Sequence, residues 1–197
     1  MLTEKSAGNT LEFIPKRPYI CGPLTELNPE VRTAVKELYV RLADICLEVI
    51  GMRAFVPHEH CDPVAHAKLA PLEVYMKEKP QICSHTNLLV VVAIEPTWGG
   101  GMEVAWAENL NIPILILAPR DKKISRLLQG PPAIRATLRF ENIKNAAEIF
   151  KTYLSNEIEP IVAELKSKSA PENSENLRRR GIFYKSLRDR LISEIAQ

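Results

Sequence analysis

A continuous apolar run from Leu88 to Ile94 is the feature that most constrains how this chain can fold. The run is rich in valine and too short to cross a membrane, so it predicts a central strand that is covered on both faces. Pro96 ends the run, and the glycines Gly99 to Gly101 follow. Glycine allows positive φ and leaves main-chain N–H groups open, so this turn is predicted to bind a ligand.

Glu103 opens the helix that is predicted after the glycines, Met102 to Leu110. In the first turn the helix macrodipole favours the ionised carboxylate, which is the form that a nucleophile needs. The sequence therefore indicates a catalytic carboxylate at this position. The alternative, which the local residues leave open, is an ordinary first-turn charge beside a tight glycine turn.

A second strand end is predicted to reach the same region. Residues 17–23 read as a first strand that ends in the turn Gly22-Pro23. In open α/β sheets, ligands bind in the crevice beyond the carboxyl ends of the strands. We therefore expect this turn to lie close to the glycines that precede Glu103.

Strand-like and helix-like segments alternate along the chain with short connections, which predicts an α/β fold with a doubly wound parallel sheet of five strands. Asn28-Pro29 is predicted to cap the first helix and Gly51 to stop it. The predicted strands are 17–23, 53–57, 88–94, 112–118 and 135–140. The predicted helices are 29–50, 64–79, 102–110 and 143–154. The second of these helices is predicted to bend near Pro71, and the last begins after the cap Asn142 and continues over 161–168.

Four regions are predicted along the chain. Residues 1–15 are a flexible leader, 16–166 the α/β domain, 167–176 a polar linker, and 177–197 a basic amphipathic helix. The basic charge of the last helix suggests an anionic partner such as RNA, a lipid surface or a substrate phosphate in a neighbouring subunit. The preferred interpretation is that its leucine stripe docks on the same or a neighbouring subunit.

Several motifs occur together in the order and spacing of one enzyme family. The chain resembles the nucleoside 2-deoxyribosyltransferase family, and most closely its 2'-deoxynucleoside 5'-phosphate N-hydrolase branch. The resemblance spans about residues 17 to 150 and rests on YICGP at 19–23, FVPHEH at 55–60, LLVVVAIEPTWGGGMEVAWA at 88–107, the IPILIL strand at 112–117 and SRLLQG at 125–130. It implies a flavodoxin-like domain that cleaves the N-glycosidic bond of a nucleoside or its 5'-monophosphate.

In that resemblance Glu103 takes the place of the family's nucleophilic glutamate. Its carboxylate would attack the anomeric carbon, and water or a second base would then take the sugar, giving a hydrolase or a transferase. Tyr19 matches the tyrosine that would orient the glutamate or contact the sugar. Gly22 and Pro23 would contact the substrate, and His60 would line the base pocket. For His60 the alternative is a solvated turn.

The resemblance also implies a site for the 5'-phosphate. Thr97, Gly99 and Gly101 match the small residues that give hydroxyl and N–H donors to it. Ser125 matches a serine that reaches the neighbouring subunit's site, which implies a homodimer or a higher homo-oligomer. No cofactor is implied, and the expected partner is a small nucleoside or nucleotide.

The chain departs from the family where an aspartate usually precedes the nucleophile on the neighbouring helix. Counting back from Glu103 without gaps leads to Lys79, and the next residue, Pro80, is predicted to break the helix. Glu78 or Glu73 could supply the acid, and we assign Glu78 a catalytic role. The other interpretations are a different way of handling the base, a non-catalytic nucleotide-binding or regulatory module, or an NAD-cleaving glycosidase.

The segment His58-Glu59-His60-Cys61-Asp62 contains residue types that bind zinc. Its spacing argues against a metal, because structural zinc sites usually draw their ligands from two separated pairs. We therefore predict no metal. His66 and His85 are the other histidines of the chain.

Length and charge agree with one small intracellular domain. A chain of 197 residues with 46% hydrophobic content can bury one core, and a net charge of +2 argues against a nucleic-acid partner. The four cysteines, at positions 21, 46, 61 and 83, show no paired spacing. With no signal peptide and no apolar run long enough for a membrane span, the sequence predicts a cytoplasmic protein.

Overall fold

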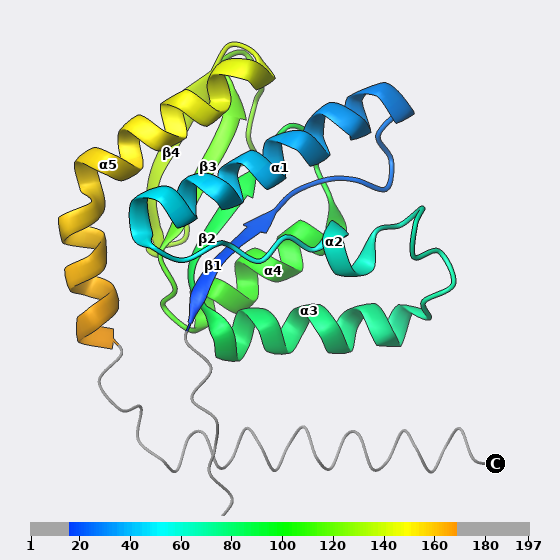
Figure 1. The fold of residues 1–197 in the computed structure, drawn as a ribbon, viewed down its shortest axis with the longest axis horizontal. Helices are drawn as coiled ribbons and strands as arrows, with labels where there is room; N and C mark the ends of the chain where they lie inside the picture. Colours follow the sequence, from blue (N-terminus) through cyan, green and yellow to red (C-terminus); the bar gives the residue numbers. More distant parts are fainter. Residues whose placement is uncertain (1–15, 169–197) are drawn as a thin grey trace, which may run out of the picture. The chain divides into compact units, whose positions relative to one another are not determined.

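The computed structural model describes residues 16–168 (Figure 1). By its internal contacts the chain forms two compact units, Met1–Asn156 and Glu157–Gln197, and the sheet and the candidate site belong to the first. The described elements are β1 (Arg17–Cys21), α1 (Pro29–Ile50), α2 (His58–Cys61), α3 (Pro71–His85), β2 (Thr86–Val92), α4 (Trp98–Asn109), β3 (Ile114–Pro119), β4 (Ile134–Phe140) and α5 (Ile143–Lys168).

The four strands are parallel and lie in the order β1-β2-β3-β4. In the register of the central strands, Tyr19 pairs with Leu89 and Leu89 with Ile114. The residues of β1, β2 and β3 are almost all buried, as a parallel sheet covered on both faces requires. The prediction of an α/β fold with a parallel sheet is confirmed.

The segment predicted as the second strand, residues 53–57, joins the sheet through one residue. Phe55 forms a parallel bridge with Tyr19: its N–H donates to the Pro18 carbonyl at 2.7 Å, and its carbonyl accepts from the Ile20 N–H at 2.9 Å. Pro57 has no N–H to extend this pairing, and α2 begins at the next residue. The described residues thus form four named strands, and a five-stranded, flavodoxin-like sheet stays a prediction.

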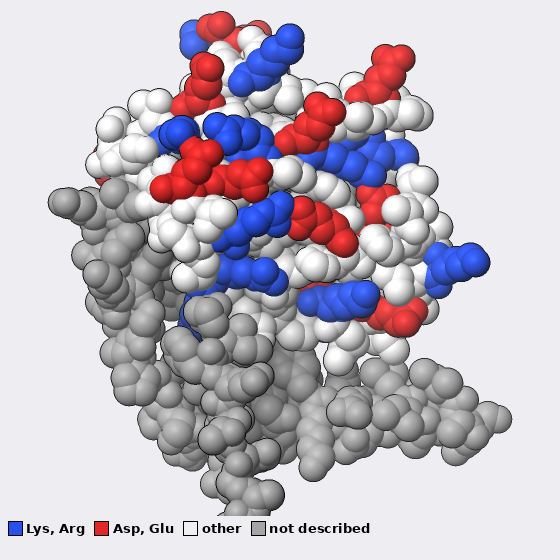
Figure 2. All heavy atoms as spheres, viewed as in Figure 1, with Lys and Arg blue, Asp and Glu red and all other residues white. Residues whose placement is uncertain are grey.

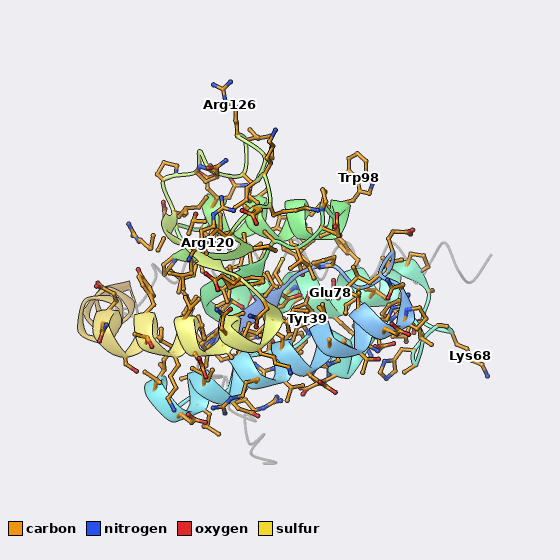
Figure 3. All side chains as sticks on the ribbon, turned by 90° about the horizontal axis from the view of Figure 1, so that it is seen from above. Tyr39, Lys68, Glu78, Trp98, Arg120 and Arg126 are labelled. Atoms are coloured by element: carbon orange, nitrogen blue, oxygen red, sulfur yellow. The ribbon has the colours of Figure 1, made fainter. Side chains whose placement is uncertain are left out.

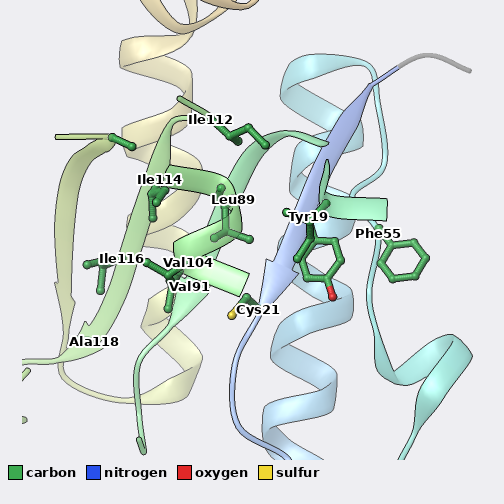
Figure 4. Packing of buried hydrophobic residues seen from close by; sticks show 13 residues of the cluster. Tyr19, Cys21, Phe55, Leu89, Val91, Val104, Ile112, Ile114, Ile116 and Ala118 are labelled. Carbon is green, nitrogen blue, oxygen red and sulfur yellow. The ribbon is translucent and has the colours of Figure 1, made fainter. Parts of the chain in front are cut away.

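Helices cover both faces of the sheet. Figures 1 and 3 show α1 and the first part of α5 on one side, with α3 and α4 on the other. Alternate side chains of the central strands, such as Leu89 and Ile114, point toward Ile82 of α3 and Val104 of α4 in one buried cluster (Figure 4). This packing fixes α4 against the sheet.

The predicted limits of α1 are confirmed. Asn28 caps the helix, since its side chain accepts a hydrogen bond from the Val31 N–H at 2.9 Å. Gly51 ends it with φ of 78°, in the left-handed region that favours glycine. Asn142 likewise caps α5, by accepting from the Asn145 N–H at 3.1 Å.

The helix predicted over 64–79 is confirmed only from Pro71 onward, as part of α3. It begins at Pro71, because proline suits the first helical position, where no N–H is needed. It continues through Pro80 to His85, so the predicted break is wrong. Proline there removes one hydrogen bond of the helix, but the fully buried side chain of Ile82 holds the following turn against the core.

The described part of α5 differs from the prediction in one respect. The sequence placed an interruption before Pro160, whereas the helix runs from Ile143 to Lys168 without one. The predicted leader 1–15, most of the linker 167–176 and the basic helix 177–197 lie outside the described residues.

Acidic and basic side chains are interspersed over the face that Figure 2 shows. Ion pairs between them include Lys151 with Glu48 at 2.6 Å and Arg53 with Glu59 at 2.6 Å. Within residues 16–168, no helix is both long and apolar enough to cross a membrane.

Candidate active site

Glu103 is the buried carboxylate of α4. The helix begins at Trp98, so residues 99–101 form its first turn and Glu103 lies in the second. The prediction of a first-turn carboxylate is wrong, because α4 begins at Trp98. Glycines 99–101 do not use the positive φ that glycine allows, since among the described glycines only Gly51 has it. Since the macrodipole effect is concentrated in the first turn, it favours the ionised form of Glu103 less than we predicted.

Two donors on β1 hold the Glu103 carboxylate instead. The Tyr19 hydroxyl donates to Oε1 at 2.6 Å, and the Cys21 thiol hydrogen-bonds the same carboxylate. Tyr19 and Cys21 leave the strand on the same side because successive strand residues alternate (Figure 4). The pKa of Glu103 is raised above its ordinary value by burial, and these two hydrogen bonds, which favour the charged form, offset part of that rise.

Gly100 brings α4 close enough to β1 for these contacts. A Cβ at this position would lie 2.8 Å from Cγ2 of Thr97 and 3.4 Å from Sγ of Cys21. A larger residue would therefore force the Thr97 side chain at the start of α4 to shift and would fill the remaining space next to Cys21 at the end of β1. The second glycine is needed for close approach, and not for an unusual backbone angle.

A cavity of about 340 Å³ opens beside Glu103. Its wall includes Gly22 and Thr25, which follow β1, and Thr97 and Gly99, which follow β2. The site therefore lies beyond the carboxyl ends of two strands, where open α/β sheets bind ligands. Its volume is within the range of small-molecule sites, roughly 300–1,000 Å³.

Glu78 of α3 lines the same cavity. Burial and the negative charge of Glu103 raise the pKa of Glu78 to about 7. Figure 3 shows Glu78 toward the middle of the view. The other candidate acid, Glu73, is exposed and caps its own helix by accepting from the Ala70 N–H at 2.7 Å. Of the two acids, Glu78 is the one that faces the cavity.

Lys79 turns away from Glu103. Its ammonium group donates to the Tyr75 hydroxyl at 2.5 Å and lies 5.0 Å and 5.5 Å from the ring centres of Tyr75 and Trp106. Because neighbouring helix residues point about 100° apart, Lys79 and Glu78 cannot face the same side. The lysine therefore does not hold the glutamate in an ion pair. Asn87, at the start of β2, donates to the Lys16 carbonyl at 3.0 Å.

The sequence placed His60 at the base pocket, but other histidines line the cavity. His60 is exposed, stacks on Phe55 with ring centres 4.6 Å apart, and is not part of the cavity wall. His58 and His66 do line the cavity. His60 belongs to α2, a single helical turn that the sequence did not predict and that turns this side chain outward.

The proposed phosphate-binding residues divide between two cavities. Gly99 lines the cavity beside Glu103, and Gly101 lines a second cavity of about 470 Å³. Thr97, like Gly22 and Gly100, lines both. Ser125 lies at the second cavity, where its hydroxyl accepts from the Leu127 N–H at 3.3 Å.

The Gly22-Pro23 turn is built around a buried tyrosine. The Tyr39 hydroxyl donates to the Pro23 carbonyl at 3.0 Å, and a Cβ on Gly22 would overlap that hydroxyl. Gly22 is thus a wall of the site, whereas Pro23 contacts Tyr39 and is not among the residues that line the cavity. Burial raises the pKa of Tyr39 well above its ordinary value, so the hydroxyl stays a donor.

Sequence analysis missed Cys21 as a partner of Glu103 and His66 as part of the cavity wall, although a turn capped by Asp62 was one of its interpretations. The spacing of Tyr19 and Cys21 on one strand could have indicated two donors on one side. The role of Asp62 depends on Lys36 of α1, which no local pattern links to it. Among the side chains that the structure describes, those of residues 16–157, no group of three or more histidine, cysteine or acidic residues is placed to hold a metal, and all four cysteines are free thiols.

The sequence matches no protein-family model and no curated protein. Among solved structures, the chain is similar to a CMP N-glycosidase, BcmB, from Clostridium botulinum, with a TM-score of 0.49 and 15% identity over 71% of this chain and 100% of that one. A likeness this weak assigns neither activity nor substrate to the chain. The family resemblance stays an interpretation of the motifs.

Proposed function

We propose that this protein cleaves the N-glycosidic bond of a nucleoside or (deoxy)nucleoside 5'-monophosphate, with Glu103 as the nucleophile. The observation that carries the proposal is one cavity with two carboxyl groups in different environments. Glu103 accepts two hydrogen bonds that favour its ionised form, and Glu78 has its pKa raised to about 7 by burial and by the charge of Glu103. Such a pair divides into a nucleophile and a proton donor.

The first half of the reaction forms a covalent intermediate. An oxygen of the Glu103 carboxylate attacks the anomeric carbon, and the bond to the base breaks with its electron pair going to the base nitrogen. Glu78 gives its proton to the departing base, directly or through a water. Tyr19 keeps the Glu103 carboxylate in place through the 2.6 Å hydrogen bond.

The second half releases the sugar. A water attacks the anomeric carbon, the ionised Glu78 takes its proton, and the bond to Glu103 breaks to restore both carboxyl groups. If a second base attacks in place of water, the result is base exchange. We propose hydrolysis as the main reaction. Glu78, with a pKa of about 7, can give and take a proton near neutral pH in either case, so assays with and without a second base distinguish the two reactions.

The start of α4 supports the choice of 5'-monophosphates. The first N–H groups of a helix have no acceptor inside the helix, and Thr97 makes no side-chain capping bond to them. The Gly101 N–H is not among these free groups, because it donates to the Thr97 carbonyl at 3.2 Å. Residues 99–101 carry no side chains that would shield these groups. Hydrogen bonds to a charged phosphate contribute about 1.5–3 kcal/mol each, so phosphorylated substrates should be preferred.

Chromatography of reaction mixtures tests this proposal. The full-length protein is incubated with a panel of nucleosides and their 5'-monophosphates, in ribo and deoxy forms, with and without a second free base. We expect free base to appear from a monophosphate faster than from its nucleoside. Release of base from no member of the panel would contradict the proposed activity, and faster turnover of nucleosides would contradict the phosphate site.

A second candidate, an NAD-cleaving glycosidase, is favoured by one observation. The cavity of about 470 Å³ shares Gly22, Thr97 and Gly100 with the one beside Glu103, so a dinucleotide could extend from one into the other. Adding NAD to the panel compares the two candidates. An ion pair between Lys79 and Glu103 would have favoured a non-catalytic nucleotide-binding module, but Lys79 contacts Tyr75 instead.

The proposal also includes three features of the whole protein. The first is a flavodoxin-like sheet in which the segment around Phe55 takes the place of a fifth strand. The second is a homo-oligomer with a site shared between subunits, and the third is action in a reducing compartment. Exposed apolar side chains, Trp98 at 95% and Leu127 at 86% exposure, support a covered surface near the second cavity. Figure 3 shows Trp98 pointing away from the body of the molecule.

A further inference from the structure

His66 is held in one orientation by its own loop. Its ring atom Nδ1 accepts a hydrogen bond from the Asp62 N–H at 3.0 Å, and its backbone N–H donates to the Asp62 carbonyl at 2.9 Å. The half-buried ring is also part of the wall of the Glu103 cavity. Since the Nδ1 edge faces the backbone of Asp62, the opposite edge, with Nε2, is the one left for the cavity.

Asp62 makes this loop rigid. Its side chain is buried, with 3% of the residue exposed, and Oδ1 accepts from the N–H groups of Val64 and Ala65, both at 2.8 Å. Its other oxygen forms an ion pair with Lys36 of α1. The turn that carries His66 is therefore anchored to α1 and does not depend on a substrate for its shape.

The hydrogen bond at Nδ1 also fixes where the ring proton lies. A neutral imidazole has one donor and one acceptor nitrogen, and an Nδ1 that accepts from a backbone N–H leaves the proton on Nε2. We infer that His66 is a specificity-determining residue, whose Nε2–H donates to a ring nitrogen or keto oxygen of the substrate base. This inference rests on the proposed function, because it takes the cavity to hold a nucleotide.

The neighbouring wall suits a flat base. Leu24, Ala67, Leu69 and Val74 are apolar members of the same cavity wall. They can contact the faces of a planar ring but cannot tell one base from another, since dispersion contacts depend little on the position of heteroatoms. A fixed N–H donor can distinguish them, because a bound base without the matching acceptor would cover this N–H and leave it unpaired.

The test measures nucleotide binding by calorimetry in the full-length Glu103→Gln protein, where turnover is expected to be blocked. The ligands are a parent 5'-monophosphate and analogues that each lack one acceptor, with a ring nitrogen replaced by C–H or a keto oxygen replaced by hydrogen. Two further changes are compared in that protein: His66→Phe keeps a planar ring without a donor, and His66→Gln keeps an N–H donor. Thermal unfolding shows that each variant is folded.

We expect His66→Phe to weaken binding of the parent roughly 3- to 10-fold, the loss typical of one neutral hydrogen bond. The analogue that lacks the acceptor for His66 should bind equally well with and without His66→Phe. His66→Gln should restore part of the affinity for the parent that His66→Phe removes. Equal weakening of the parent and every analogue, or no weakening, overturns the inference. If His60→Phe, and not His66→Phe, weakens binding of the parent while one analogue is unaffected, the role belongs to His60.

The proposed function fails separately from this inference. If the native protein releases no base but the binding pattern follows His66, the recognition role holds and the enzyme proposal falls. If base is released but nucleotide binding does not depend on the N–H donor at position 66, the enzyme proposal holds and the recognition role falls. If no nucleotide binds at all, both fall.

Discussion

At the end of β1, Tyr19 and Cys21 govern the charge of Glu103. Burial alone would keep this carboxyl group protonated at a higher pH, and each donor opposes that effect. Cys21 can do so only because burial raises the pKa of its thiol well above the ordinary value, so that the group stays a neutral donor. These two hydrogen bonds thus favour the ionised carboxylate of Glu103, an effect that the sequence assigned to the helix macrodipole.

Replacing Cys21 should change the pH dependence of the reaction. Cys21→Ala removes one influence that lowers the pKa of Glu103, so that pKa should rise and the acid limb of kcat/KM should move to higher pH. Cys21→Ser keeps a donor and should leave the limb close to its native position. The measurement is a pH profile of kcat/KM for the three proteins. An unchanged acid limb in a folded Cys21→Ala protein would show that the thiol has no such role.

Glu78 should determine the other limb of the same profile. Because its pKa is raised to about 7, it is protonated below that pH and can serve as the acid, and activity should decline as pH rises through about 7. Glu78→Gln cannot transfer a proton, so kcat should fall by roughly 10²–10⁴ and the decline above neutral pH should disappear. Glu73→Gln, on the exposed cap of α3, is the matched comparison. If it caused the larger loss, our choice between the two acids would be wrong.

At the scale of the helix, Gly100 and Gly101 are neighbours with opposite surroundings. A methyl group on Gly100 would press on Thr97 and Cys21, whereas one on Gly101 would meet no atom within 4 Å. Gly100→Ala should therefore destabilise the fold by about 1–3 kcal/mol, as overpacking does. Gly101→Ala should stabilise it by about 0.5–1 kcal/mol, because alanine is the better helix former. Thermal unfolding compares them, and equal effects would contradict the close packing of α4 on β1.

The helices and strands were predictable where their signals are local. The cap at Asn28, the stop at Gly51 and the valine-rich strand before Pro96 depend on nearby residues. The cap and the stop appear where the sequence placed them, and the strand, predicted over 88–94, covers Thr86–Val92. The run through Pro80 was not predictable, because it depends on Ile82 reaching a core made by distant strands. The extra first turn of α4 escaped prediction because three consecutive glycines favour a turn when no packing is considered.

At the scale of the whole molecule, the sequence placed Glu103, Tyr19 and Thr97 in one region because parallel strands bring their carboxyl ends to one edge. The sequence offered Glu78 and Glu73 as the acid and preferred Glu78, and it placed His60 at the base pocket where His66 lines the cavity. Which of each pair faces the cavity depends on where α3 begins and on the single turn of α2, and both follow from tertiary packing. The structure separates the members of both pairs, and their roles rest on the experiments above.

The most direct test of the account is the rate of base release by Glu103 variants. Using the best substrate of the panel, turnover is measured for the native protein, Glu103→Gln and Glu103→Ala, with circular dichroism to show that each variant is folded. Because Glu103 is proposed to form the covalent bond to the sugar, both changes should lower the rate by ~10³-fold or more. A folded Glu103→Ala protein that releases base at a rate near the native one would contradict the mechanism.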